Sequence, residues 1–194
     1  MPPDEMFAEL CHELGIAPDE GPVSLAYRYA QRVHDGVTRA NGDPFIRHSL
    51  ATARIVAGWG LGEAMVQLAL LHDSMDRDKT SSLATPQELD ALLGPDGVHI
   101  VEQMANLGYV GDSYEKRGIQ DELGQLLEMS HEPRIILLKL ASALELARDL
   151  DRQSRERQQR RAELLLNVYS PLARRFGVWA VKREIEDRCL FALF

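Results

Sequence analysis

Apolar residues recur at intervals of three and four along almost the whole chain, and this spacing constrains the fold more than any other feature of the sequence. In residues 44–59, for example, one face of a helix would carry Phe45, His48, Thr52 and Ile55. We find no alternation of period two between hairpin turns, which strands would require. The sequence therefore predicts an all-α protein, a helical bundle of about ten helices.

Helix start and stop signals divide this pattern into separate elements. Asp43 followed by Pro44 predicts an N-cap and a first helical position, and the residues from Thr85 to Glu88 predict a capping box. Asp112 is expected to cap a later helix. The expected helices cover residues 4–13, 22–34, 44–59, 63–75, 85–94, 98–107, 113–129, 134–150, 154–169 and 171–176, and a last one runs to the C-terminus.

The composition is that of a folded protein with an acidic surface. Of the 194 residues 45% are hydrophobic and 27% are charged, and the net charge is −8. This charge argues against non-specific binding of DNA or RNA, which requires a basic surface. The N-terminus is acidic where a signal peptide would be basic, and no apolar run is long enough to cross a bilayer. We expect one cytoplasmic domain over residues 1–194, with no membrane or DNA partner.

A histidine and an aspartate stand together at the end of an apolar helix, in Leu70-Leu71-His72-Asp73. His48 lies on the inward face of the preceding helix, where it can converge with this pair. Imidazole is a common ligand of transition metals, and a carboxylate accepts Mn, Mg or Zn. His48, His72 and Asp73 are therefore candidate metal ligands, although a buried histidine can also be satisfied by a backbone carbonyl.

Four stretches in order resemble one known family. They are His34 to His48, Leu70 to Asp73, Leu138 to Ala141, and Tyr169 to Gly177. Together they resemble the HD-type hydrolase domain of the RelA/SpoT-homologue family, which makes and degrades the alarmones ppGpp and pppGpp. The resemblance covers about residues 22–190, preceded by an N-terminal helix within residues 1–20.

The resemblance implies an HD-type helical fold that binds one divalent ion, usually Mn, through two histidines and two aspartates. His48, His72 and Asp73 match three of these ligands. In the family a water activated by this metal removes the 3′-diphosphate of ppGpp or pppGpp, a chemistry that a divalent ion suits. The resemblance also assigns Arg39, Asn41 and Lys139 to the substrate; a guanidinium can grip phosphate with two bonds.

Several residues depart from the pattern of the family. Ser142 stands where the fourth metal ligand, an aspartate, is usual, and Leu146 replaces an asparagine near the substrate. Asp76 and Arg77 occupy the two catalytic positions where the family has a Glu-Asp pair, so one acid is kept and the other has reversed its charge. A lost anionic ligand and an added cation both weaken the binding of a divalent ion. Glu145, one helical turn after Ser142, is the candidate substitute ligand.

Arg77 allows two interpretations, and His34 is expected to have a structural role. Arg77 is either a plain surface charge or an internal cation that fills the vacated ligand position. His34, at the end of its helix, is expected to have a structural role in packing or capping. The apolar C-terminal residues from Leu190 to Phe194 indicate a helix that continues into a longer protein or one that docks on a partner.

Three functions follow from the resemblance and its departures. The first is an impaired, regulatory hydrolase domain that packs on a synthetase domain of the same longer chain, whose parent could be a GTP pyrophosphokinase. The second is an active, Mn-dependent (p)ppGpp 3′-pyrophosphohydrolase or a related nucleotide phosphohydrolase. In a third, the pocket binds the guanine nucleotide without cleaving it. We expect the first.

Overall fold

The computed structural model describes residues 1–107 and 119–193, and its regular structure in these ranges is helical. An isolated bridge between Thr38 and Pro44 is the one β-type pairing found there. The prediction of an all-α fold is therefore confirmed. None of the described helices is both long enough and apolar enough to span a membrane.

The contacts divide the chain into two compact units, Met1–Asn106 and Leu107–Phe194. Each unit is described by itself. The single domain expected over residues 1–194 stays a prediction.

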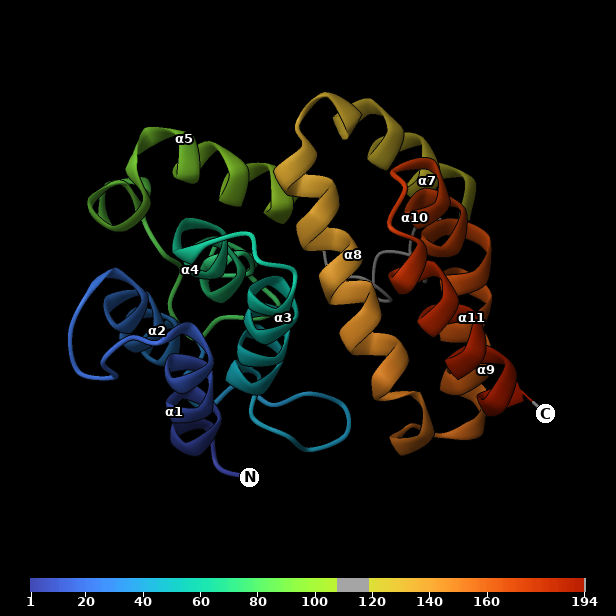
Figure 1. Ribbon diagram of the computed structural model, residues 1–194, viewed down its shortest axis with the longest axis horizontal. Coiled ribbons are helices and arrows are strands. Elements are labelled where there is room, and N and C mark those ends of the chain that lie inside the picture. Colours follow the sequence, from blue (N-terminus) through green and yellow to red (C-terminus); the bar gives the residue numbers. More distant parts are fainter. Residues whose placement is uncertain (108–118, 194) are drawn as a thin grey trace. The chain divides into compact units, whose positions relative to one another are not determined.

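The first unit is built around the packing of α3 on α4 (Figure 1). Helix α1 packs against α3, and α2 packs against α4. The apolar faces of these helices are almost completely buried, as the helical spacing predicts. The helices are α1 (Pro3–Leu14), α2 (Pro22–Val33), α3 (Ile46–Gly58), α4 (Glu63–Leu71) and α5 (Pro86–Leu107).

Glycines and a capping box set several of these boundaries as predicted. Gly15 ends α1 in the left-handed conformation, with φ of 69°. At the start of α5, Thr85 and Glu88 exchange the reciprocal bonds of a capping box. Gly94, with φ of 69° and ψ of 172°, breaks α5 into two segments, which match the two helices expected over residues 85–94 and 98–107.

The predicted start of the helix that carries His48 is wrong. Helix α3 begins at Ile46, and Asp43 does not cap it. Instead the carbonyl of Asp43 accepts a bond of 2.8 Å from the backbone N–H of Arg39, and Pro44 pairs with Thr38. Asp43 therefore belongs to a tight hairpin before the helix, because its backbone is already used in that turn.

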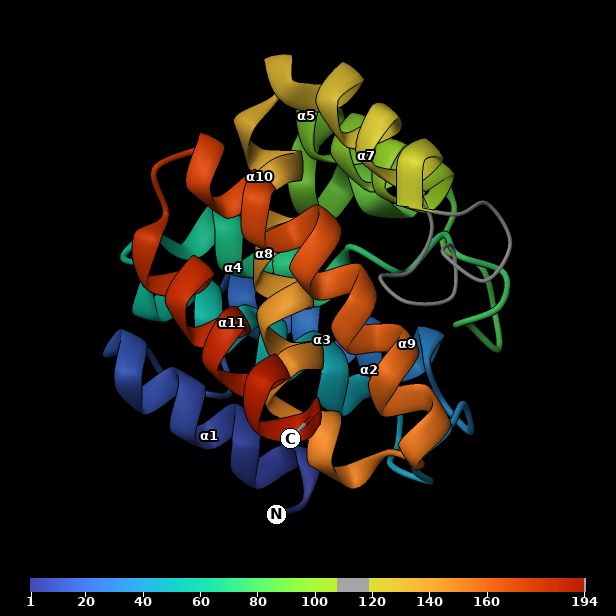
Figure 2. The same ribbon diagram turned by 90° about the vertical axis from the view of Figure 1, so that its right-hand side faces the viewer.

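The second unit is organised around α8 and α11. Figure 2 shows α11 running beside α9, and α10 and α8 also pack against α11. The expected cap at Asp112 lies outside the described residues. The elements are α7 (Ile119–Glu128), η1 (Met129–His131), α8 (Pro133–Arg148), η2 (Leu150–Arg152), α9 (Arg155–Leu164), η3 (Leu165–Tyr169), α10 (Ser170–Arg175) and α11 (Trp179–Leu193).

A π-helical turn, η3, joins α9 and α10 into one continuous helical run. Pro171 lies in the first turn of α10 and has no N–H to donate. Its ring also crowds the carbonyl four residues earlier in a regular α-helix, and a wider turn relieves that contact. This turn places Tyr169 in the interior, where its hydroxyl donates a bond of 2.7 Å to Glu122 of α7.

Candidate metal centre

The two histidines and the aspartate predicted as metal ligands come together inside the first unit. His48 is the third residue of α3, His72 caps the C-terminal end of α4, and Asp73 follows in the next turn. Because α3 packs directly on α4, the ends of these helices present the three side chains to one another. All three residues are buried, with exposed fractions of 0%, 1% and 4% in that order.

The potential ligand atoms of these three residues, which we call the triad, converge closely. His48 Nε2 lies 3.3 Å from His72 Nε2 and 3.4 Å from Asp73 Oδ2. His72 Nε2 lies 3.2 Å from the same carboxylate oxygen. All three atoms lie within 4.8 Å of one another. Two imidazole nitrogens and a carboxylate oxygen in this arrangement are the donor types that transition metals prefer.

The hydrogen bond on the far side of the His72 ring fixes which nitrogen carries its proton. His72 Nδ1 lies 2.7 Å from the carbonyl oxygen of Ala69, which can only accept. Nδ1 therefore carries the hydrogen, and Nε2 presents its lone pair to the triad. Metal-bound histidines are commonly oriented by a backbone carbonyl in this way.

When the imidazoles are neutral, the carboxylate of Asp73 and the lone pair of His72 Nε2 face a single possible donor, His48. The Oδ2 atom of Asp73 is buried without a hydrogen bond, although both imidazoles lie nearby. Burial raises the pKa of Asp73, but the charge that the facing His72 and His48 rings carry when protonated, and the hydrogen bonds that they can then donate, lower it more, so the carboxyl stays ionised. A proton on His48 Nε2 can form a hydrogen bond with either His72 Nε2 or Asp73 Oδ2, but it cannot satisfy both atoms. A divalent cation would satisfy all three atoms, so the triad fits a metal ion.

The two expected catalytic positions lie in the turn that follows the triad. Asp76 is half-buried, and its Oδ1 accepts a bond of 2.9 Å from the backbone N–H of Asp78. Burial is the main cause that raises the pKa of Asp76 above its usual value. Arg77 is exposed, which favours the interpretation as a surface charge over that of an internal cation. Catalytic roles for both residues stay predictions.

The predicted substrate residues Arg39 and Asn41 lie in the hairpin that precedes α3. The amide of Asn41 is engaged within this turn, because its Oδ1 accepts from the backbone of Asp43 and its Nδ2 donates to the carboxylate of Asp43. Arg39 is half-buried. Asn41 thus has a structural role in shaping the turn, and contacts of either residue with a substrate stay predictions.

The remaining predicted site residues belong to α8 in the second unit. Lys139, Ser142, Glu145 and Leu146 are all buried, and Lys139 is 1% exposed. The predictions that Glu145 substitutes as a ligand for the aspartate replaced by Ser142, and that Lys139 contacts the substrate, remain untested.

The structure adds a residue whose role the sequence did not reveal. His34 is buried, and its Nδ1 lies 2.6 Å from the carbonyl oxygen of Lys79, which follows the triad in sequence. Its Nε2 is buried without a hydrogen-bond partner. Burial is the main cause that lowers the pKa of His34. The sequence indicated only that this histidine ends a helix, because its partner lies 45 residues away.

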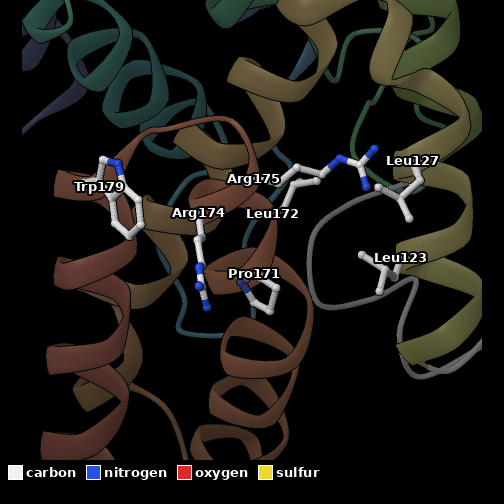
Figure 3. A pocket seen from close by; sticks show the side chains of 7 residues that line it. All are labelled: Leu123, Leu127, Pro171, Leu172, Arg174, Arg175 and Trp179. Carbon is white, nitrogen blue, oxygen red and sulfur yellow. The ribbon is translucent and has the colours of Figure 1, made fainter.

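The fourth stretch of the family pattern, Tyr169 to Gly177, lines a cavity of about 590 Å³ in the second unit. Figure 3 shows Arg175 extending toward Leu127, whereas Arg174 lies between Trp179 and Pro171. Among the described residues that line it there is no acid, cysteine or histidine, so these residues offer the cavity neither a metal ligand nor a general base. Its lining residues are Leu123, Leu127, Pro171, Leu172, Arg174, Arg175 and Trp179.

Comparison with known proteins identifies the same family. The family model described as HD domain matches residues 26–179. The chain is 34% identical over 174 residues to a GTP pyrophosphokinase of Myxococcus xanthus, covering 88% of this chain and 22% of that protein. It is 30% identical over 165 residues to a guanosine-3′,5′-bis(diphosphate) 3′-pyrophosphohydrolase of Aquifex aeolicus, covering 85% of this chain and 23% of the relative. It thus spans less than a quarter of the length of these curated relatives.

A solved structure shares the fold. It is described as a metazoan orthologue of SpoT that hydrolyses ppGpp and plays a role in starvation responses. The TM-score is 0.67 at 20% identity, and the match covers 90% of this chain and 98% of that chain. At this identity the match supports the fold alone, and it agrees with the helical architecture described above. The family match and the sequence relatives together show that the chain belongs to the HD-domain family, among the HD domains of RelA/SpoT homologues.

Proposed function

We propose that this chain is an HD domain of (p)ppGpp metabolism whose hydrolase site is impaired and whose role is regulatory. The observation that carries the proposal is that the chain keeps an intact, buried triad while other positions of the family pattern are altered. The triad supports retained metal binding. The altered residues remove groups that hydrolysis in this family requires.

The metal that we propose for the triad is Mn, held by His48, His72 and Asp73. A bound divalent ion would lower the pKa of a water ligand and neutralise charge on a phosphate. The protein's own contribution is the orientation of the ligands, since the Ala69 carbonyl holds the lone pair of His72 Nε2 toward the other two side chains.

Asp76 is the proposed acid–base residue of the turn. Its half-buried carboxyl has a raised pKa and can therefore hold and release a proton nearer to neutral pH than an exposed aspartate. Arg39, in the hairpin before α3, is the proposed phosphate contact, because a guanidinium binds phosphate oxygens in pairs. Asn41 would support the shape of that hairpin.

The altered positions weaken this machinery in two ways. Ser142 offers a neutral hydroxyl where the family supplies an anionic ligand, and Arg77 adds a cation near the ion that the site must attract. Loss of a single supporting partner of a metal site typically costs about 10–100-fold in affinity or activity. Two changes of charge together, with Leu146 in place of an asparagine, are expected to cost more.

We propose ppGpp or pppGpp as the nucleotide and a synthetase domain of a longer chain as the partner. The support for the partner is that relatives named GTP pyrophosphokinase extend well beyond the matched region. A cytoplasmic location is proposed because these nucleotides are made and degraded within cells, and it agrees with the absence of a membrane-spanning helix among the described residues.

The test compares the native chain with a restored variant. The restored variant carries Ser142→Asp, Arg77→Asp and Leu146→Asn, and ppGpp hydrolysis is measured with added Mn. Impairment predicts no turnover by the native chain and measurable turnover by the restored variant, abolished by His72→Ala. Turnover by the native chain that depends on His72 would refute impairment.

The second candidate is an active Mn-dependent (p)ppGpp 3′-pyrophosphohydrolase. The observation that favours it is Glu145, a buried carboxylate one turn after Ser142 on α8. If Glu145 replaces the missing ligand, Glu145→Gln should abolish both Mn binding and turnover. A Gln variant that binds Mn and turns over like the native chain would remove this candidate.

A further inference from the structure

The end of α2 is fastened to the turn that follows the triad by three hydrogen bonds. His34 Nδ1 donates to the carbonyl of Lys79 at 2.6 Å. The carbonyl of Val33 accepts from both the backbone N–H and the hydroxyl of Ser81, at 2.9 and 3.1 Å. We call this set of bonds the latch.

The latch holds the segment that contains Asp76. This segment is also folded on itself: the carbonyl of Asp76 accepts from the Thr80 hydroxyl and from the backbone of Lys79. Two backbone bonds tie the segment to the chain just before it: the N–H of Asp76 donates to the carbonyl of Asp73, and the N–H of Ala84 donates to the carbonyl of Ser74, both at 3.0 Å. The latch adds the attachment of residues 79–81 to α2.

The ring of His34 is itself held in place. It packs against Phe45, with ring centroids 4.9 Å apart. The ring of Phe45 in turn packs against that of His48 of the triad, and these two centroids lie 5.5 Å apart. The ring is only 3% exposed, so the donor side of its bond to the carbonyl of the half-buried Lys79 is shielded from water. Loss of this donor removes the net contribution of one hydrogen bond.

We propose that His34 is a positioning residue, whose Nδ1–H holds the Asp76 segment against α2 and so, together with the backbone bond from Asp76 to Asp73, sets where the Asp76 carboxylate stands relative to His72 and Asp73. The inference rests on the proposed function for the part that Asp76 takes in chemistry. The attachment of the segment is independent of that function and can be tested without any turnover.

Two substitutions separate the two nitrogens of the ring. In His34→Asn the side-chain amide can donate from the position of Nδ1, but nothing replaces Nε2. In His34→Gln the amide reaches the position of Nε2 instead, so the bond to the Lys79 carbonyl is lost. The latch therefore predicts that the Asn variant resembles the native chain and that the Gln variant does not.

The main readout is hydrogen exchange of the amides in residues 76–84. We expect His34→Gln and His34→Ala to speed this exchange by about tenfold, the net value of one hydrogen bond, and His34→Asn to leave it within about threefold. Ser81→Ala, which removes one of the two bonds to Val33, should cause a smaller acceleration in the same segment. Unchanged exchange in the Gln and Ala variants, or equal acceleration in the Asn variant, would overturn the proposal.

A matched control exists in the second unit. His131 Nδ1 makes the same kind of bond, 2.8 Å to the carbonyl of Glu128, but on an exposed residue. His131→Ala should leave exchange in residues 76–84 unchanged. Acceleration spread over the whole chain in the His34 variants would indicate general destabilisation and would also overturn the proposal.

Mn affinity, measured by calorimetry, distinguishes positioning from metal ligation. Positioning predicts a dissociation constant within about threefold of the native value in the Asn, Gln and Ala variants. A loss of affinity beyond about tenfold in the Asn variant would show that Nε2 serves the metal and would refute the assigned role.

In a background that hydrolyses ppGpp, His34→Gln should lower kcat and leave KM unchanged, and His34→Asn should restore kcat. If no background turns over, the proposed function fails while exchange and Mn affinity still decide the latch.

Discussion

At a pH where imidazole is neutral, replacing Asp73 by asparagine should stabilise the metal-free protein and abolish its stabilisation by Mn. The Oδ2 atom of Asp73 is buried without a hydrogen bond, which carries a cost of about 1–3 kcal/mol for an unsatisfied acceptor. An asparagine of the same shape can turn its N–H toward the lone pair of His72 Nε2, 3.2 Å from the present oxygen. The substitution thus removes a buried charge and supplies a donor where one is missing.

The expected size of this effect follows from the same contact. A gain of about 1–2 kcal/mol raises the melting temperature by roughly 2–8 °C in a chain of this length. Mn at about one hundred times its dissociation constant stabilises the native chain by about 2.7 kcal/mol and leaves the asparagine variant unaffected. The Asp73→Asn variant should therefore melt at a higher temperature than the native chain in EDTA, and the native chain should melt at the higher temperature in Mn.

The assay is thermal unfolding followed by circular dichroism at about pH 8, where free imidazole is neutral. Asp90→Asn, an exposed position, serves as the control and should change stability by less than about 0.5 kcal/mol. A lower melting temperature of Asp73→Asn in EDTA would show that the carboxylate is stabilised by a partner in the free protein. Equal stabilisation of both proteins by Mn would show that the metal binds elsewhere.

Three further measurements address other buried groups. Burial raises the pKa of Cys189 to about 12. Iodoacetamide at about pH 8 should therefore label this thiol roughly a thousandfold more slowly than free cysteine. Labelling within minutes of mixing would contradict this. Tyr169→Phe removes the donor 2.7 Å from Glu122 and should cost about 2–3 kcal/mol in urea unfolding, whereas a loss below about 0.5 kcal/mol would show that the bond is dispensable. Burial lowers the pKa of His34, so below about pH 6.5 the unfolded chain binds more protons at this residue than the native chain does. The free energy of unfolding should therefore fall as the pH drops through that value. It should fall less in His34→Asn, which has no imidazole to protonate.

The triad could be predicted from sequence because each of its signals is local. His72 and Asp73 are adjacent, and His48 falls on the inward face of the preceding helix by simple periodicity. A packed pair of consecutive helices then brings the three together. The family resemblance pointed to the same residues.

The features that sequence did not reveal depend on partners far away in the chain. His34 was expected only to pack or cap, because its acceptor is a backbone carbonyl at Lys79 that no sequence pattern marks. Glu122 belongs to a polar run and yet is buried, since Tyr169 reaches it across 47 positions. The wrong cap at Asp43 has a related cause: the hairpin uses its backbone before the helix begins.

The candidate metal site and the altered positions come from different parts of the chain, and this separation has a consequence for the proposed function. The triad is supplied entirely by α3, α4 and the following turn, whereas Ser142 and Leu146 belong to α8. If the unsatisfied carboxylate at Asp73 lowers the stability of the metal-free protein, a bound ion would restore that loss whether or not a nucleotide is cleaved. Mn-dependent stability without turnover is therefore the state expected of a regulatory HD domain, and the Asp73→Asn experiment measures it directly.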